Sequence, residues 1–182
     1  MRLVSSEALA EGQRFYTEHA FDLSGLRAHY GKLLELSRAC VSPAGRGGAI
    51  LMLIWKYTMQ FIEHNGYDVM IGCASFKGTD YLQHTEILSY LHDKHLATPE
   101  LMPIPRPEVE SVAIKSFLSE PGKGKERGKV PTMLRGYLKI GAHISDHAII
   151  DPVFNTTFVA IYVDASYMFG SNHALVNKSI DH

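Results

Sequence analysis

One carboxylate inside an apolar run is the first residue of this chain that could do chemistry. Glu35 stands in the run LLELSRACV, residues 33–41, whose composition favours a β-strand. A carboxylate in apolar surroundings is suited to take a proton near neutral pH, so Glu35 is a candidate general base. Two simpler alternatives remain open, a strand residue that faces solvent and an ion pair with Arg38.

The turn that follows this run could bind an anion. Residues 42–48, SPAGRGG, hold three glycines and Arg46 directly before a strongly apolar segment. A strand–turn–helix junction offers unpaired N–H groups and the positive end of a helix to a phosphate. The turn is not a P-loop, because Gly48 is followed by Ala49 and Ile50, and Ile50 also replaces the third glycine of the dinucleotide fingerprint. Phosphate binding and a purely geometric role for the glycines both remain open.

These residues must be positioned by the elements around them. Apolar residues at 50, 53, 54, 57 and 61 recur at the spacing of one helix face, and neighbouring apolar residues widen it. The pattern therefore predicts a largely buried helix over 47–65 that stops at Asn65-Gly66. The run YDVMIGCASF, 67–76, is typical of a strand buried on both faces, so strand, helix and strand favour a right-handed βαβ unit.

The rest of the chain predicts a mixed α/β order in a single domain over residues 1–182. MRLVSS reads as the end of a strand, and a short helical pattern follows around 23–33. A helix is predicted over 79–97 with Thr79 or Asp80 as its cap, and another opens at Pro131 and runs to 140. The runs at 112–118 and 156–166 predict strands.

Composition limits the class of protein. The chain has 182 residues, 46% hydrophobic and 20% charged, which fits one soluble globular domain. A formal net charge of -1 gives no support for nucleic-acid binding. Cys40 and Cys73 lie in apolar runs, which favours reduced core thiols. No apolar stretch reaches the length of a membrane span, and the histidines do not show the spacing of a metal site.

A family resemblance adds to this interpretation. The pattern Val41-x-Pro43-x-x-Arg46-Gly47 before a helix resembles the acyl-donor loop of the GNAT acyltransferase superfamily. Longer segments resemble its hemolysin-like branch, which contains the ornithine-lipid N-acyltransferases: FYTEHAFDLSGL (15–26), LELSRACVSP (34–43), HNGYDVMIGCASF (64–76) and RGYLKIGAHISDHAIIDPVFNTTF (135–158). The resemblance implies a three-layer GNAT-like fold, with a mixed twisted sheet and helices on both faces. It also implies strands and helices before Arg2, so we expect an N-terminally truncated domain.

The resemblance implies a reaction as well. Members of the branch move a 3-hydroxyacyl chain from acyl carrier protein to the α-amine of ornithine, giving lyso-ornithine lipid. Glu35 would act as the base or position the amine, and Ser37 and Arg38 share its strand, where a backbone N–H polarises the thioester carbonyl. The expected donor loop, which holds the phosphate of phosphopantetheine, comprises Val41, Arg46, Gly47, Gly48 and Ala49.

Further roles follow from the same resemblance. Tyr81 or Tyr90 would protonate the leaving thiolate, and direct transfer leaves Cys40 without a role as nucleophile. No cofactor is implied, because the acyl group arrives on the pantetheine arm of acyl carrier protein or coenzyme A. A cytoplasmic protein with peripheral contact at the inner membrane face is implied, and the basic loop 123–129 either docks an acidic carrier or lipid headgroups or is simply solvated.

Two other hypotheses for the function remain open. A GNAT-fold enzyme could acylate another amine, either another amino acid or an acceptor of the homoserine-lactone type. A chain without the first strands could instead be a non-catalytic remnant that binds donor or lipid.

Overall fold

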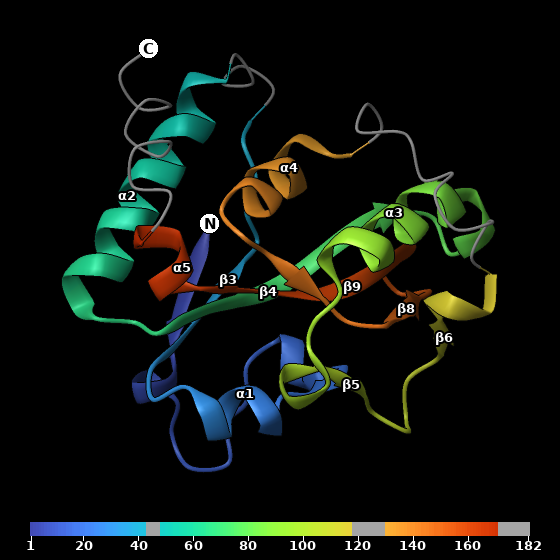
Figure 1. Cartoon of the computed structure of the whole chain (residues 1–182), viewed down its shortest axis with the longest axis horizontal. Helices are drawn as coiled ribbons and strands as arrows, with labels where there is room; N and C mark the ends of the chain where they lie inside the picture. The colour runs from blue at the N-terminus through green and yellow to red at the C-terminus, as the bar shows by residue number, and fades with distance from the viewer. Residues whose placement is uncertain (43–47, 118–129, 171–182) are drawn as a thin grey trace.

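A twisted sheet forms the middle layer of the molecule. The computed structural model describes residues 1–42, 48–117 and 130–170. The sheet is seven-stranded, in the order β1-β3-β4-β9-β8-β6, and β7 also pairs with β9 (Figure 1). Its strands are β1 (Arg2–Ser5), β3 (Leu33–Ser37), β4 (Val69–Lys77), β6 (Ser111–Ala113), β7 (His143–Ile144), β8 (His147–Asp151) and β9 (Thr156–Asp164).

The predicted crossover unit is present. Helix α2 (Ala49–Asn65) connects β3 to β4, and these two strands pair in parallel from Leu33–Val69 to Leu36–Gly72. Gly66 ends the helix in the left-handed conformation, with φ 63°, where glycine carries no steric penalty. The other pairings in the sheet are antiparallel.

Helices cover both faces of the sheet, as the GNAT-like three-layer expectation requires. Figure 1 shows α2, α3 (Thr85–His95), α4 (Thr132–Lys139) and α5 (Ala165–Phe169) above the sheet. Below it lie α1 (Ser24–His29) and the small sheet of β2 (Phe21–Asp22) and β5 (Ile104–Pro105). Each face therefore has its own apolar core, one that includes Leu34 and Leu36 and another that includes Leu33 and Ile71.

The strand predicted at residues 33–41 is shorter than its apolar run. Strand β3 ends at Ser37, and not at residue 41, because Arg38 takes a positive φ of 52° and turns the chain away from the sheet. Cys40 is consequently exposed, so the prediction of a core thiol there was wrong, whereas Cys73 on β4 is partly buried.

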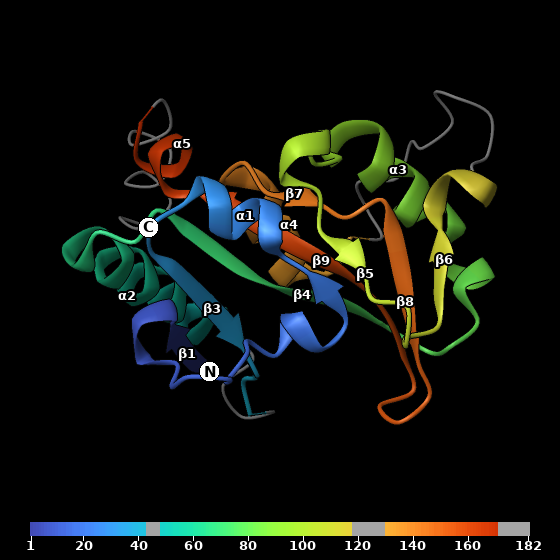
Figure 2. The same cartoon turned by 90° about the horizontal axis from the view of Figure 1, so that it is seen from below.

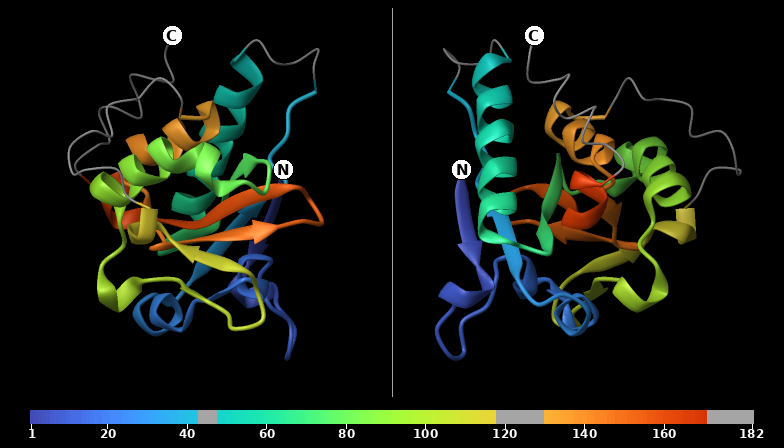
Figure 3. Two further views of the ribbon diagram at one scale, coloured as in Figure 1. Left: turned by 90° about the vertical axis from the view of Figure 1, so that its right-hand side faces the viewer. Right: turned by 60° about the vertical axis from the view of Figure 1, so that its left-hand side comes forward.

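The prediction that α2 is largely buried was also wrong. Only Thr58, Met59 and Ile62 of this helix are buried. These three lie in its C-terminal half, while Figure 3 shows the other half extending past the sheet. The large apolar residues of α2 that are exposed are Ile50, Met52, Leu53, Tyr57 and Phe61.

The remaining elements follow the predictions with local differences. Asp80 caps a 3-10 turn, Tyr81–His84, that leads into α3. The run at 112–118 is only partly a strand, because β6 gives way to a 3-10 turn over Ile114–Phe117. Strand β9 confirms the prediction at 156–166 up to Asp164, whose carboxylate caps α5. None of the helices in the described residues is long and apolar enough to cross a membrane.

Candidate active site

Glu35 faces the interior on the α1 side of the sheet. Its side chain is 1% exposed, so the solvent-facing alternative is excluded. Val4 on β1 and Ile71 on β4 are its neighbours across the sheet. Within residues 1–42, 48–117 and 130–170, Glu35 forms no ion pair with Arg38 or with any other cation.

Hydrogen-bond donors from a distant turn hold the Glu35 carboxylate instead. The backbone N–H of Tyr16 donates to Oε2 at 2.9 Å, and that of Thr17 donates to Oε1 at 2.7 Å. The Thr17 hydroxyl donates to Oε1 as well, at 2.7 Å. A carboxylate can accept about four hydrogen bonds, so Oε2 keeps acceptor capacity for one further donor. The arrangement supplies three donors to a buried carboxylate and leaves one acceptor position on Oε2 unfilled.

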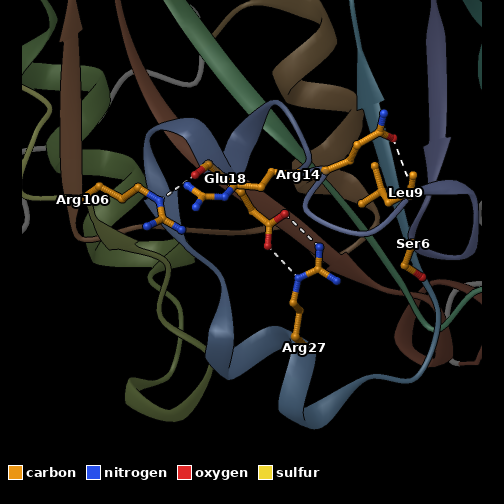
Figure 4. A pocket seen from close by; sticks show the side chains of 8 residues that line it. Ser6, Leu9, Arg14, Glu18, Arg27 and Arg106 are labelled. Atoms are coloured by element: carbon orange, nitrogen blue, oxygen red, sulfur yellow. Dashed lines mark hydrogen bonds and ion pairs between the residues drawn. The ribbon is translucent and has the colours of Figure 1, made fainter.

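An ion pair on Glu18 fixes this turn. The Glu18 carboxylate accepts bonds from Arg27 Nε at 2.6 Å and Arg27 Nη2 at 2.8 Å, and from the Phe15 N–H at 2.9 Å. Arg106 Nε donates to the Glu18 carbonyl at 2.6 Å (Figure 4). Burial raises the pKa of Glu18, but the bonds from Arg27 and Phe15 and the charges of Arg27 and Arg106 outweigh it, so this pKa lies below its usual value. The backbone donors of residues 16 and 17 are thereby held in place.

Strands β3 and β4 part immediately beyond Glu35. Their parallel pairing ends at Leu36–Gly72, where a Cβ on residue 72 would lie 2.7 Å from the Leu36 carbonyl oxygen. Only glycine allows this approach without a shift of the backbone. Ser37 and Arg38 then diverge from β4, and the left-handed backbone of Arg38 is a strained conformation of the kind found at functional sites.

Two adjacent cavities lie at the parting of the strands. The Glu35 cavity has a volume of about 470 Å³, and its lining includes Thr17, Glu35 and Phe158. The Tyr137 cavity has a volume of about 280 Å³, and its lining includes Ala39, Pro131 and Tyr137. Both are lined by Leu36, Ser37, Arg38, Cys73 and Ser75. Because Glu35 belongs to the α1 side and Tyr137 packs on the α4 side, the two cavities bring residues from opposite faces of the sheet to the same parted strands.

A third cavity adjoins the Glu35 cavity. This Arg2 cavity has a volume of about 510 Å³ and shares Arg2, Tyr16 and Glu35 with the Glu35 cavity. Its remaining lining includes Gln13, Arg14 and His19. Glu35 therefore lines both the Glu35 cavity and the Arg2 cavity.

The structure brings together some of the predicted site residues. Glu35, Ser37 and Arg38 all line the Glu35 cavity. Gly48, with φ 89°, caps α2 and Ala49 is its first residue, whereas Arg46, Gly47 and the basic loop at 123–129 lie outside the described residues. Val41 is partly buried beyond the end of β3.

The tyrosines favoured from the sequence lie elsewhere. The Tyr81 ring contacts Phe117 and the Tyr90 ring contacts His95, and neither tyrosine lines the three cavities. Tyr137 of α4, whose ring packs edge-on against Trp55 at 4.7 Å, lines its cavity instead. Its position within the RGYLKIGAH segment was the only sequence signal.

Burial raises the pKa of two side chains in the cavity lining, Tyr137 and Cys73. It raises the pKa of Tyr137 to about 12, with a smaller contribution from Cys73. Burial also raises the pKa of the Cys73 thiol to about 12, so this thiol stays protonated and is a poor nucleophile. Tyr137 is therefore a neutral donor next to the strand parting. In the described part of the chain, no three His, Cys, Asp or Glu side chains converge as metal ligands.

Sequence comparisons with known proteins identify the family of this chain. Residues 1–56 match the model of the acetyltransferase (GNAT) domain. Over 182 residues the chain is 31% identical to the L-ornithine N(alpha)-acyltransferase of Rhodobacter capsulatus, covering 99% of this chain and 69% of the relative. The chain belongs to this acyltransferase family. Its mixed sheet with helices on both faces agrees with the GNAT domain match.

Other members of the L-ornithine N(alpha)-acyltransferase family match as well. The enzyme of Agrobacterium fabrum is 33% identical over 175 residues, or 93% of this chain, and that of Brucella abortus is 32% identical over 165 residues, or 88%. The chain spans 58% of the length of each of these two relatives. No solved structure matches the chain.

Proposed function

We propose that this chain moves a 3-hydroxyacyl group from the thioester of acyl carrier protein to the α-amine of ornithine, giving lyso-ornithine lipid. The observation that carries the proposal is the pair of adjacent cavities at the parting of β3 and β4, which share wall residues, with Glu35 lining one and Tyr137 lining the other. The name of the relatives, L-ornithine N(alpha)-acyltransferase, supports ornithine as the acceptor.

The Tyr137 cavity suits the donor arm. Its lining includes Ala39, on the segment that leads from β3 toward α2, together with Ser37 and Cys73. A pantetheine arm laid along this cavity brings its thioester to the backbone groups where the strands part. A backbone N–H at this point would polarise the carbonyl, an effect worth about 3–4 kcal/mol for one good donor. Coenzyme A carries the same arm, so the acidic carrier protein is a further part of the proposal.

The chemistry needs two proton transfers. The neutral amine nitrogen attacks the thioester carbon, the C–N bond forms, and the carbonyl oxygen becomes an oxyanion. The amine proton passes to Glu35, whose Oε2 accepts one hydrogen bond from the protein. As the carbonyl re-forms, the C–S bond breaks and the leaving thiolate takes the proton of the Tyr137 hydroxyl. Solvent then exchanges protons with both side chains, which restores the starting state.

Aromatic side chains in the lining of the Glu35 cavity support a path for the acyl chain. Phe154 and Phe158 contribute apolar lining, and Phe154 lies at the turn between β8 and β9. Val153 and Phe154 are 84% and 66% exposed, and Figure 2 shows this turn extending away from the body of the molecule. We include in the proposal that the acyl chain leaves along this turn toward a lipid surface, because large exposed apolar side chains are costly in water.

The decisive experiment is reconstituted transfer. The purified chain is mixed with 3-hydroxyacyl carrier protein and ornithine, while thiol release and acyl-ornithine are measured by absorbance and mass spectrometry. We expect equal amounts of both products, with Nα as the acylated position. Matched reactions with acyl coenzyme A and with other amino acids test the donor and the acceptor separately. A folded chain that releases no thiol with any of these pairs would contradict the proposal.

A further inference from the structure

We propose that Arg2 binds the carboxylate of the amino-acid acceptor inside the Arg2 cavity. The inference rests on the proposed function in one respect, because it takes the acceptor amine to be the group that reaches Glu35. It adds a second group of the acceptor, the carboxylate, that the site would recognise besides the amine. With this contact, the enzyme selects amino acids over amines that lack a carboxylate.

The sheet places Arg2 and Glu35 on the same face. In the antiparallel pair of β1 and β3, Arg2 lies opposite Ser37 and Val4 lies opposite Glu35. Residues two apart on a strand share a face, and so do residues directly opposite each other. Arg2 and Glu35 are therefore diagonal neighbours, and both line the cavity between β1 and the turn at residues 12–16.

Arg2 is also available to an anion. In the part of the chain that the structure describes, no carboxylate lies within ion-pair distance of its guanidinium. Glu35 is the one acidic residue in the lining of this cavity, and its carboxylate is already held by Tyr16 and Thr17. The planar guanidinium matches a carboxylate with two parallel hydrogen bonds.

The arginines near the turn at residues 12–16 have different surroundings. Arg27 and Arg106 bind Glu18, and Figure 4 shows the Arg14 side chain extending toward Arg106. Arg14 lines the cavity next to Ser6 and Arg27 as well as the Arg2 cavity. Arg2 is thus the arginine that shares both a strand face and two cavities with Glu35.

The dimensions fit a small amino acid. The Arg2 cavity, at about 510 Å³, is within the range of small-molecule sites, which is about 300–1,000 Å³. An α-amino acid carries its amine and its carboxylate on one carbon, so fixing the amine at Glu35 leaves the carboxylate close by. A guanidinium on the same sheet face can then hold the amine in line with the thioester.

The test compares ornithine with ornithinamide, which keeps both amines and replaces the carboxylate by a neutral amide. We expect the wild-type chain to prefer ornithine in kcat/KM by about 10–100-fold, the size of one charge-assisted contact. Arg2→Gln should remove that preference by lowering kcat/KM for ornithine alone. Arg2→Lys should keep part of it, and Lys115→Gln on the exposed turn after β6 should keep all of it.

Two results would overturn the inference. One is a wild-type chain that treats ornithine and ornithinamide alike; the other is an Arg2→Gln variant that loses both acceptors to the same extent. Calorimetric binding of amino acids and their amides, without donor, separates this inference from the proposed function. If another amino acid binds through its carboxylate and Arg2→Gln abolishes that binding, the inference holds although ornithine is not the acceptor. If ornithine is acylated without any preference over its amide, the proposed function holds and the inference fails.

Discussion

The backbone N–H of Thr17 lies 2.7 Å from Oε1 of Glu35, and the Thr17 hydroxyl lies 2.7 Å from the same oxygen. This contact joins two segments that are separated in sequence. The turn at residues 14–18 and strand β3 consequently act as one unit, in which the turn holds the carboxylate and the strand places it at the parting from β4. A substitution in either segment should affect the other.

Replacing Glu35 by Gln should reduce both activity and stability. The amide has the shape of the carboxylate but presents N–H groups where the protein offers only donors, so at least one buried donor loses its acceptor. We expect the free energy of unfolding to fall by about 1–3 kcal/mol. The loss of a proton acceptor should lower kcat by about 100-fold or more. Denaturant unfolding and thiol-release kinetics measure the two effects.

Thr17→Val provides the matched control for Glu35→Gln. It removes one hydroxyl bond and leaves the backbone donors and the charge of Glu35 in place. Activity should therefore fall far less than with Glu35→Gln. Equal losses in kcat for the two variants would mean that Glu35 acts through the position of the turn and not as a proton acceptor.

Glu18 should make stability depend on acid pH. Its pKa is lowered in the folded protein, so the ionised form stabilises the fold above the unfolded pKa of about 4.3, and this stability is lost as pH falls through the folded value. Glu18→Gln should cost about 1–3 kcal/mol at pH 7, and the difference from wild type should shrink below about pH 4. Urea unfolding across pH 3–7 measures this.

Glu7→Gln is the control for the Glu18 series. Glu7 and Lys32 lie 3.2 Å apart, but their side chains are 58% and 44% exposed. Exposed pairs contribute about 0–1 kcal/mol, so this variant should behave almost like the wild type. A Glu18→Gln variant as stable as Glu7→Gln at pH 7 would contradict the structural role of the Glu18 cluster.

Gly72→Ala should disturb the point where the strands part. The new methyl group would lie 2.7 Å from the Leu36 carbonyl oxygen, so β3 or β4 must shift. We expect a lower melting temperature together with a larger loss of kcat than of donor affinity. Gly31→Ala is the comparison, because its methyl group would meet a side-chain oxygen, Asp68 Oδ2, at 3.2 Å, which requires a shift of only a few tenths of an ångström. If both variants melt and turn over alike, the close approach at Gly72 has no special role.

Tyr137→Phe should slow the departure of the thiol. Burial raises the pKa of Tyr137 to about 12, so the hydroxyl is protonated from neutral pH up to about pH 11 and its ionisation should add no falling limb in that range. Loss of the acid should lower kcat by about 100-fold for an alkyl thioester and leave KM for the donor nearly unchanged. An aryl thioester, whose thiolate leaves without a proton, should react almost equally with both proteins. Equal loss with both donors would indicate a packing role against Trp55.

Periodic and local signals predicted the frame of this fold. Strand β4, helix α2 with its stop at Gly66, and strand β9 follow from apolar runs and one glycine, because each depends on residues close in sequence. The parallel pairing of β3 with β4 then follows from the short crossover. The apolar run around Glu35 indicated a buried carboxylate on the same basis, but it left a solvent-facing side chain open, and burial of Glu18 was not predicted.

The rest depended on tertiary contacts. The positive φ of Arg38 has no signature in LLELSRACV, so the predicted strand ran too far. The apolar content of α2 indicated burial, but the sheet reaches only part of its length. The donors at residues 16 and 17 are backbone groups, which any residue type supplies, and no sequence pattern points to them. Arg2 acquires its place beside Glu35 only through the register of β1.

Helix α2 has a practical consequence for work with this chain in solution. Its residues Ile50, Leu53, Tyr57 and Phe61 are 44%, 51%, 65% and 39% exposed and recur at the spacing of one helical stripe. Each Å² of such surface left in water costs about 25 cal/mol, and excluded salts such as sulfate increase that cost. The chain should therefore precipitate early in ammonium sulfate, bind strongly to a phenyl column, and remain dispersed in a mild detergent. Buffer composition will then decide whether an assay reports single molecules or clusters.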